Sequence, residues 1–256
     1  MARYQVILKY DGTEFLGFQR QAEDRNERTI QSVFESALRS IGWQGKTILA
    51  AGRTDTGVHA IGQVVTFDLD WRHSPADLMA AMNANLPVDI AVSFVKVVQD
   101  DFHPRFDALS RTYEYRVICQ PARDPLRERF AWRIFPSLNL QVLNQAAELL
   151  TGVHDFAAFG TPPRTGGATI RQLFRCGWTE LGDEFFFEIQ ANAFLYHMVR
   201  RIVGFQVALS QGRYDLQDLC DKLSPGLHNL VRELAPPQGL RLINVEYPED
   251  VVNRNT

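Results

Sequence analysis

Residues 50–59 of this chain, AAGRTDTGVH, place a carboxylate, a guanidinium, two hydroxyls and an imidazole around two glycines. An apolar run precedes them, and glycine adopts backbone angles that other residues avoid, so Gly52 and Gly57 predict a tight loop with Asp55 at its tip. Loops held by rigid strands often carry chemistry, and a carboxylate there serves as a nucleophile or a base. The alternative is a structural turn, in which Asp55 bonds nearby backbone N–H groups and Arg53 is solvated.

A second group of residues has the chemistry of an RNA contact. Residues 102–106, FHPRF, combine two aromatic rings, an imidazole and a guanidinium, which suits unstacked bases and phosphates. The alternative is a linker whose phenylalanines fill neighbouring cores. Farther on, Tyr113 and Tyr115 share one face of a predicted strand, where a tyrosine pair is usually packing. Arg200 lies beside the apolar stripe of a predicted helix, and it either reaches a carboxylate or is solvated.

The composition bounds the class of protein. With 256 residues, 45% hydrophobic and 22% charged, the chain is an ordinary globular protein. A net charge of -3 argues against indiscriminate coating of nucleic acid. Arginines nevertheless cluster in residues 102–133, which is compatible with a confined phosphate-binding face. The alternative is a genome that encodes arginine wherever lysine would serve.

The cysteines, histidines and apolar runs predict a location and exclude several partners. Cys119, Cys176 and Cys220 are odd in number and far apart, so we expect free thiols in a reducing cytoplasm. Charges interrupt every apolar run before the length of a membrane span, and we expect no membrane partner and no secretion. Neither cysteines nor histidines show metal-ligand spacing, and we infer no metal and no nucleotide cofactor.

The elements that must position these residues form two similar series. In the first half, alternation and helical spacing predict elements in the order β-α-β-β-α-β, with Thr29 as a helix N-cap, Gly42 as that helix's stop and Ser74 at the start of the second helix. They are a strand 4–10, a helix 30–41, strands 47–51 and 63–67, a helix from 75 and a strand 90–98. The second half repeats the order: a strand 112–119, a helix 140–150, strands 172–178 and 185–191, a helix 194–209 and a strand 240–245.

This order predicts an α+β fold of two ferredoxin-like (βαββαβ) halves, whose antiparallel sheets meet at a central cleft. We place the halves at residues 1–101, with the Asp55 loop, and 102–256, with RNA-contacting loops. Residues 120–137 and 160–168, rich in Pro, Gly and Arg, are expected to be flexible loops at the rim of the cleft.

Six segments together resemble the tRNA pseudouridine synthase A family, in that family's order and over nearly the whole chain. The Gly-Arg-Thr-Asp-x-Gly-Val-His segment at 52–59 is highly specific, whereas the others gain weight only in combination. The segments are residues 10–13, 17–21, 51–60, 102–106, 111–115 and 192–204.

The resemblance implies an enzyme that isomerises uridine to pseudouridine at positions 38, 39 and 40 in the anticodon stem-loop of tRNA. It implies an essential aspartate, no cofactor and a homodimer. Asp55 matches the catalytic aspartate, Tyr113 the tyrosine that packs on the target base, and Arg200 the arginine that pairs with the aspartate, with Arg53 as further support. The tRNA-binding residues implied are Phe102, His103, Pro104, Arg105, Phe106, Gly160, Thr161, Pro162, Pro163 and Arg164.

The chemistry fits this set of residues. Pseudouridine formation breaks the N1–C1′ bond and joins C5 to the same sugar carbon, with no redox change and no net hydrolysis. Asp55, near Arg53 and Arg200, is expected to stay ionised, which suits a nucleophile or base. The residues leave open whether it attacks the sugar, attacks the base or abstracts a sugar proton.

Two competing functions remain at this level. A nucleoside hydrolase resembling a glycosidase would need two carboxylates across the bond, and the chain marks only one. A catalytically silent RNA-binding or folding-assistant module would use Asp55 only to cap the turn.

Overall fold

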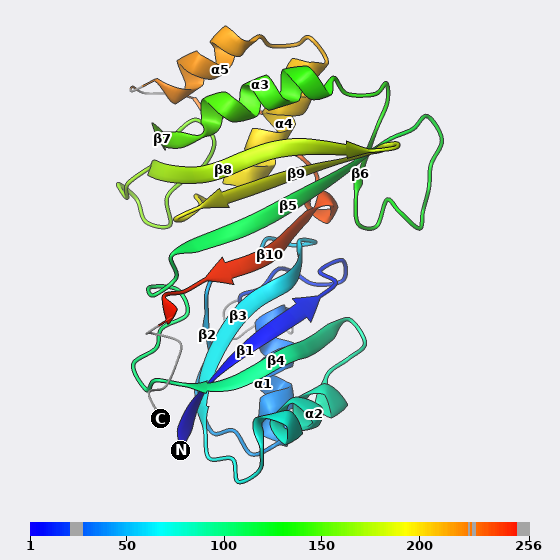
Figure 1. Ribbon diagram of the computed structural model, residues 1–256. Coiled ribbons are helices and arrows are strands. Elements are labelled where there is room, and N and C mark those ends of the chain that lie inside the picture. Colours follow the sequence, from blue (N-terminus) through cyan, green and yellow to red (C-terminus); the bar gives the residue numbers. More distant parts are fainter. Residues whose placement is uncertain (21–27, 225, 227–228, 250–256) are drawn as a thin grey trace. The chain divides into compact units, whose positions relative to one another are not determined.

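The computed structural model describes residues 1–20, 28–224, 226 and 229–249; Gln21, the last residue of one family segment, lies outside them. The fold is α+β, and the chain divides into two compact units (Figure 1). The first contains Met1–Leu109 and Leu242–Thr256, and the second contains Ser110–Arg241. None of the helices in the described part of the chain has the length and apolarity that a membrane crossing needs.

This division differs from the boundary between 101 and 102 that the sequence suggested. Residues 102–109 and the C-terminal segment from Leu242 both group with the first unit. Contacts between these two segments explain the grouping: the ring of Phe102 packs on Tyr247 at 5.0 Å between centroids, and the Tyr247 hydroxyl donates to the Pro104 carbonyl at 2.7 Å.

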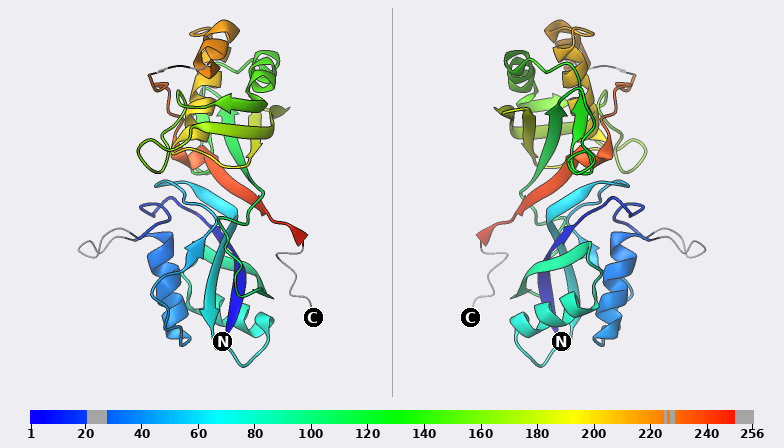
Figure 2. Two further views of the ribbon diagram at one scale, coloured as in Figure 1. Left: turned by 90° about the vertical axis from the view of Figure 1, so that its left-hand side faces the viewer. Right: turned by 90° about the vertical axis from the view of Figure 1, so that its right-hand side faces the viewer.

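The first unit has the predicted order β-α-β-β-α-β. Its elements are β1 (Ala2–Tyr10), α1 (Ile30–Ser40), β2 (Leu49–Ala50), β3 (His59–Leu69), α2 (Pro75–Asn85) and β4 (Ile90–Val98). Strand β1 pairs antiparallel with both β3 and β4, and β2 pairs antiparallel with β3. Helices α1 and α2 contact each other beside this sheet (Figure 2). The predicted strand 90–98 is confirmed to the residue, whereas β2 is shorter and β3 longer than predicted.

Helix α1 forms because its sequence provides both a cap and an apolar face. Ile30, Phe34 and Leu38 recur at helical spacing and are buried. Thr29 is confirmed as the N-cap: its side chain accepts from the Ser32 N–H, and the Ser32 side chain accepts in return from the Thr29 N–H. Gly42, just after the helix, has a φ of 98°, which glycine adopts without strain.

The second unit contains the predicted main elements and, among its described residues, shorter ones that the sequence analysis missed. Strands β5 (Ser110–Cys119), β9 (Glu184–Ala191), β8 (Ile170–Leu181) and β7 (Gly152–Asp155) lie in that order, all antiparallel. Helix α3 (Leu140–Leu150) contacts β8, α4 (Met198–Ser210) and α5 (Leu216–Leu223). Missed were β7, α5 and β6 (Trp132–Ile134), which pairs parallel to β5.

Two expectations for this unit need correction. Residues 120–137 are not only a loop, because they contain β6 and are fastened by an ion pair of Arg127 with Asp183 at 2.7 Å. The helix predicted from 194 begins at Met198, because His197 has a left-handed backbone with a φ of 63°. Tyr196 instead bridges Thr161, donating its N–H to the Thr161 carbonyl at 2.9 Å.

The strand predicted at 240–245 is confirmed as β10 (Leu240–Glu246), after a short 3-10 turn, η1 (Pro237–Gly239). Leu240 and Arg241 belong to the second unit and the rest of β10 to the first. In the first unit, β10 lies next to β3 at Gly62, where a Cβ would stand 2.3 Å from the Ile243 carbonyl oxygen. Gly62 therefore permits an approach of two backbones that no side chain would allow.

Candidate active site

Asp55 lies in the connection between β2 and β3, residues 51–58, here called the Asp55 loop. Its carbonyl accepts from the Val58 N–H at 3.1 Å, and Gly57 has a φ of 77°. The turn predicted around Asp55 is therefore present, with Gly57 in the left-handed region. The Asp55 side chain is half-buried and Arg53 is exposed.

Residues 10–18 hold this loop mainly through Thr54, which sequence analysis did not single out. The Thr54 hydroxyl lies 2.8 Å from the Tyr10 hydroxyl, and the Thr54 carbonyl accepts from the Phe18 N–H at 3.0 Å. From β3, the Gln63 side chain donates to the Gly52 carbonyl at 3.0 Å. Burial raises the pKa of Tyr10 to about 12, although hydrogen bonds with Thr54 and Gln63 act in the opposite direction.

Two glycines bring residues 10–18 against the loop backbone to backbone. A Cβ on Gly12 would stand 2.0 Å from the Val58 carbonyl oxygen. Gly17 has a φ of 85°, and its Cβ would stand 3.0 Å from the Thr54 carbonyl oxygen. Such close approach fixes the loop from one side. The sequence contains a signal for these contacts, because Gly12 and Gly17 lie in the segments 10–13 and 17–21 that resemble the family. The sequence analysis assigned no role to either glycine.

His59 is a further residue beside the loop without an assigned role. Its Nδ1 accepts from the Gly12 N–H at 3.0 Å, and the same atom lies 3.2 Å from an Asp11 carboxylate oxygen. The His59 ring thus joins Gly12 and Asp11, which follow β1, to the first residue of β3.

In the second unit, the tyrosine pair divides into a core residue and a partly accessible one. Tyr115 is fully buried and donates to the Pro236 carbonyl at 2.8 Å, and burial raises its pKa well above the ordinary value. Tyr113 is half-buried, pairs with Ile189 across the sheet, and meets the ring of Phe194 edge-on at 5.1 Å. Only Tyr113 is therefore suited to contact a base.

Arg200 is held by the protein rather than solvated. Its side chain is 9% exposed and its Nε donates to the Ala235 carbonyl at 2.8 Å, while the Ala235 N–H donates to the Arg200 carbonyl at 3.1 Å. The neighbouring Arg201 donates from Nε to the Val231 carbonyl at 3.2 Å. Segment 231–235 thus fixes the first turn of α4.

The predicted RNA-contacting segment 102–106 separates into anchors and an exposed group. Phe102 and Pro104 are buried, and both contact Tyr247 as described above. Phe106 is 76% exposed, with the His103 ring at 4.2 Å and the Arg105 guanidinium carbon at 5.9 Å from its ring. The packing alternative therefore holds for Phe102 and Pro104, whereas Arg105 and Phe106 are exposed.

The loop 160–164 shows a similar division. Gly160 is buried, and a Cβ there would stand 2.6 Å from the Cβ of Leu195. Thr161, Pro163 and Arg164 are exposed. Gly160 therefore packs against the rest of the unit and supports the loop, whereas most of the residues that follow it are exposed to solvent.

The first unit thus carries Asp55, Arg53 and residues 102–106, and the second carries Tyr113, Arg200 and residues 160–164. Within the described ranges, no group of three or more His, Cys, Asp or Glu side chains is arranged to hold a metal ion.

A family model identifies the chain. The model described as tRNA pseudouridine synthase matches residues 6–107 and 146–248. The chain is therefore an RNA-modifying enzyme of the isomerase class, one that converts uridine to pseudouridine. It belongs to the tRNA pseudouridine synthase family.

Curated relatives in this family match the sequence over nearly the full length of this chain. Proteins named tRNA pseudouridine synthase A from Chloroflexus aurantiacus and Syntrophomonas wolfei are each 37% identical over 98% of this chain, covering 91% and 99% of the relative. The one from Colwellia psychrerythraea is 36% identical over 97% of this chain and 95% of its own. A solved Cbf5-Nop10-Gar1 complex aligns with 94% of this chain and 48% of its own, at 12% identity and a TM-score of 0.36, a likeness too weak to support an inference.

Proposed function

We propose that this protein converts uridine to pseudouridine at positions 38, 39 and 40 in the anticodon stem-loop of tRNAs, with Asp55 as its essential group and no cofactor. The observation that carries the role of Asp55 is its place in a loop held by backbone contacts from Gly12 and Gly17. A carboxylate fixed in this way is suited to react at one defined sugar or base atom.

The reaction is an internal exchange of bonds. The N1–C1′ bond breaks, C5 bonds to C1′, C5 loses its proton and N1 gains one, so that atoms and electrons balance without a redox partner. Asp55 acts either as a nucleophile, attacking C1′ or the uracil ring, or as a proton acceptor, removing a proton from the sugar. All three routes require the same carboxylate.

A base in a stem must leave its stack before it reacts, at a cost of a few kcal/mol. We assign Tyr113 the replacement stacking surface, because its ring is partly accessible and oriented by Phe194. Arg200 is assigned the pairing with the aspartate, and its bond to the Ala235 carbonyl would set the direction of its guanidinium. Arg53, which is exposed, is assigned a phosphate of the displaced strand.

The tRNA contacts follow the exposure of each residue. Arg105 and Phe106, with His103 behind them, offer a cation and a ring to RNA. Thr161, Pro163 and Arg164, with Pro162, form a second contact. Phe102, Pro104 and Gly160 support these contacts from within.

The finer description of fold and assembly is also part of the proposal. We assign a ferredoxin-like half to each of the series β1-α1-β2-β3-α2-β4 and β5-α3-β8-β9-α4-β10. The central cleft, the homodimer and the cytoplasmic location stay predictions.

Mass-spectrometric mapping of pseudouridine in an unmodified tRNA transcript tests the proposal, with the wild-type protein and Asp55→Asn side by side. We expect modification at 38 to 40 by the wild type alone, while both proteins bind the transcript. Release of free uracil would instead show a hydrolase. Binding by both proteins with no modification by either would show a silent RNA-binding module.

A further inference from the structure

Helix α1 contains a glutamate that is wholly buried, Glu35, in the same unit as the Asp55 loop. We propose that Glu35 is a positioning residue for this loop, fixing both the chain that enters it and the segment that packs against it. The inference rests on the proposed role of Asp55.

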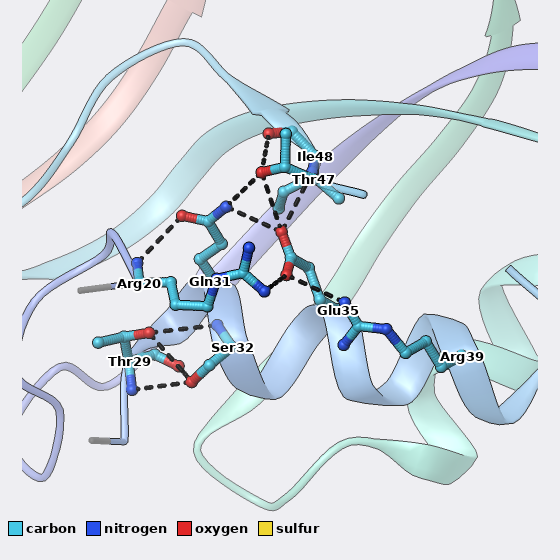
Figure 3. Close-up of polar contacts among 8 residues, drawn as sticks. All are labelled: Arg20, Thr29, Gln31, Ser32, Glu35, Arg39, Thr47 and Ile48. Carbon is cyan, nitrogen blue, oxygen red and sulfur yellow. Dashed lines mark hydrogen bonds and ion pairs between the residues drawn. The ribbon is translucent and has the colours of Figure 1, made fainter. Parts of the chain in front are cut away.

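The carboxylate of Glu35 has polar partners on both oxygens (Figure 3). Oε1 accepts from the Gln31 amide at 2.8 Å, the Thr47 hydroxyl at 3.2 Å and the Ile48 N–H at 3.2 Å. Oε2 lies 3.1 Å from Arg20 Nη1 and 3.5 Å from Arg39 Nη2. Burying a carboxylate is costly, and apolar side chains often replace buried ion pairs without loss of stability. Stability alone therefore gives a weak reason for a glutamate here.

One set of contacts fixes the chain that enters the loop. Thr47 and Ile48, both bonded to Oε1, immediately precede β2. Strand β2 has only two residues, paired with β3, and the Asp55 loop begins at the next residue, Ala51. So short a strand provides little anchoring of its own, and the contacts with Glu35 fix the two residues that precede it.

The other set fixes the segment that packs against the loop. Besides bonding Oε1, the Gln31 side chain accepts from the Arg20 N–H at 3.0 Å, and the Gln31 N–H donates to the Phe18 carbonyl at 2.9 Å. Phe18 in turn donates its N–H to Thr54, the residue before Asp55, at 3.0 Å. A continuous series of hydrogen bonds therefore joins the Glu35 carboxylate to the neighbour of Asp55.

Removal of this carboxylate would leave buried donors unsatisfied, free Thr47 and Ile48, and remove one of the bonds that hold the Gln31 side chain. A displacement of about 1 Å at a catalytic group lowers a rate by up to roughly a hundredfold. We therefore expect slower chemistry in a protein that still folds and binds tRNA.

The test compares Glu35→Ala, Glu35→Gln, Thr47→Val and the control Arg39→Gln. Arg39 contacts the same carboxylate through an exposed guanidinium, which lies over the ring of Trp43 at 5.5 Å from its centroid, so its loss serves as the matched control. For each variant we would measure the single-turnover rate of pseudouridine formation at saturating tRNA, the tRNA Kd, and the melting temperature.

Glu35→Ala should lower the saturated rate by about tenfold or more, with the Kd changed less than about threefold. Thr47→Val, nearly isosteric, should lower it by about threefold, since it loses the bond to Oε1 and the bond that the Thr47 hydroxyl accepts from the Gln31 amide at 2.8 Å. Glu35→Gln keeps an acceptor for the loop contacts and should restore most of the rate. Arg39→Gln should match the wild type.

Wild-type rates at saturation in folded Glu35→Ala or Thr47→Val would overturn the proposal, because a purely structural glutamate would change only the melting temperature. If Glu35→Ala does not fold, the Thr47→Val rate decides alone. A wild-type protein without activity, or an active Asp55→Asn, would contradict the proposed function instead.

Discussion

At the scale of single residues, the proposed catalytic residue and the residue that holds its loop are adjacent in the chain. Thr54 makes the contacts that hold the loop, to Tyr10 and to Phe18, and Asp55 beside it keeps a half-buried carboxylate. The loop is therefore held at the residue next to Asp55, which fixes the position of the carboxylate that we propose to react. Replacing Tyr10 or Tyr113 with phenylalanine removes a single hydroxyl and tests the role of each residue directly.

Tyr10→Phe should lower the free energy of unfolding by about 1 kcal/mol at pH 8, because the buried Thr54 hydroxyl loses its partner. Tyrosine is neutral when protonated, so a folded-state pKa of about 12 against 10 favours folding below pH 10, and this contribution is lost as the pH rises towards 12. At pH 11 the ionisation of Tyr10 should therefore have lowered the free energy of unfolding of the wild type by about 1 kcal/mol. The variant has no hydroxyl at this position and undergoes no such loss.

Urea unfolding of both proteins at pH 8 and pH 11 measures the effect. The stability difference should close at pH 11, since Tyr115 and Cys176, whose pKa values are also raised by burial, contribute equally in both proteins. A difference as large at pH 11 as at pH 8 would mean that Tyr10 ionises normally.

Tyr113→Phe should leave tRNA affinity largely intact and slow turnover, because the ring and its contact with Phe194 remain while the hydroxyl is lost. Single-turnover rates and filter binding on the same tRNA separate the two effects. A loss of affinity equal to the loss in rate would contradict the assignment of Tyr113 to the reacting base.

At the scale of elements, periodicity predicted the longer helices and strands well. Strand β4 and helix α3 match their predicted ranges, and Thr29 is the predicted cap. The shorter β6 and β7 were missed because three or four residues carry no periodic signal. The start of α4 was placed early because residues 194–197 continue a helical pattern, whereas Tyr196 pairs with the distant Thr161 and His197 has a left-handed backbone.

The same limit applies to the candidate site. Residue types marked Asp55 and the segment 102–106, but alternation along a strand could not tell buried Tyr115 from half-buried Tyr113. Nor could it show that Phe102 faces Tyr247 in the core, because that contact joins residues distant in the chain. Burial depends on which element lies opposite, and a single sequence does not record it.

Gly12→Ala should strongly disturb the end of β1, because the new Cβ would stand 2.0 Å from a backbone oxygen of the Asp55 loop. We expect a loss of about 2 kcal/mol or more in unfolding free energy, together with reduced pseudouridine formation. Gly177→Ala, in β8, is the control, since its Cβ would meet only the Asn144 side chain at 3.6 Å. Equal stabilities of the two variants in urea would show that residues 10–18 do not pack against the loop in this way.

At the scale of the whole molecule, charge limits how RNA can be held. Lys and Arg total 27 against 30 Asp and Glu, so the overall field does not attract a polyanion. Several arginines are also engaged by carboxylates, such as Arg127 with Asp183 and Arg133 with Glu128. Binding of tRNA must therefore depend on a small number of exposed cations at defined places.

Arg105→Ala tests this dependence, because Arg105 is an exposed cation beside the exposed ring of Phe106. The variant should weaken tRNA binding and reduce the slope of log K against log salt by about one, as expected for one lost phosphate contact. Arg213→Ala is the control: Arg213 is 55% exposed, lies 3.8 Å from Glu233 and has no proposed RNA contact. Binding titrations over a range of salt concentrations would show equal slopes for wild type and Arg105→Ala if the proposed contact were absent. A slope reduced in both variants would instead mean that tRNA binding responds to overall charge.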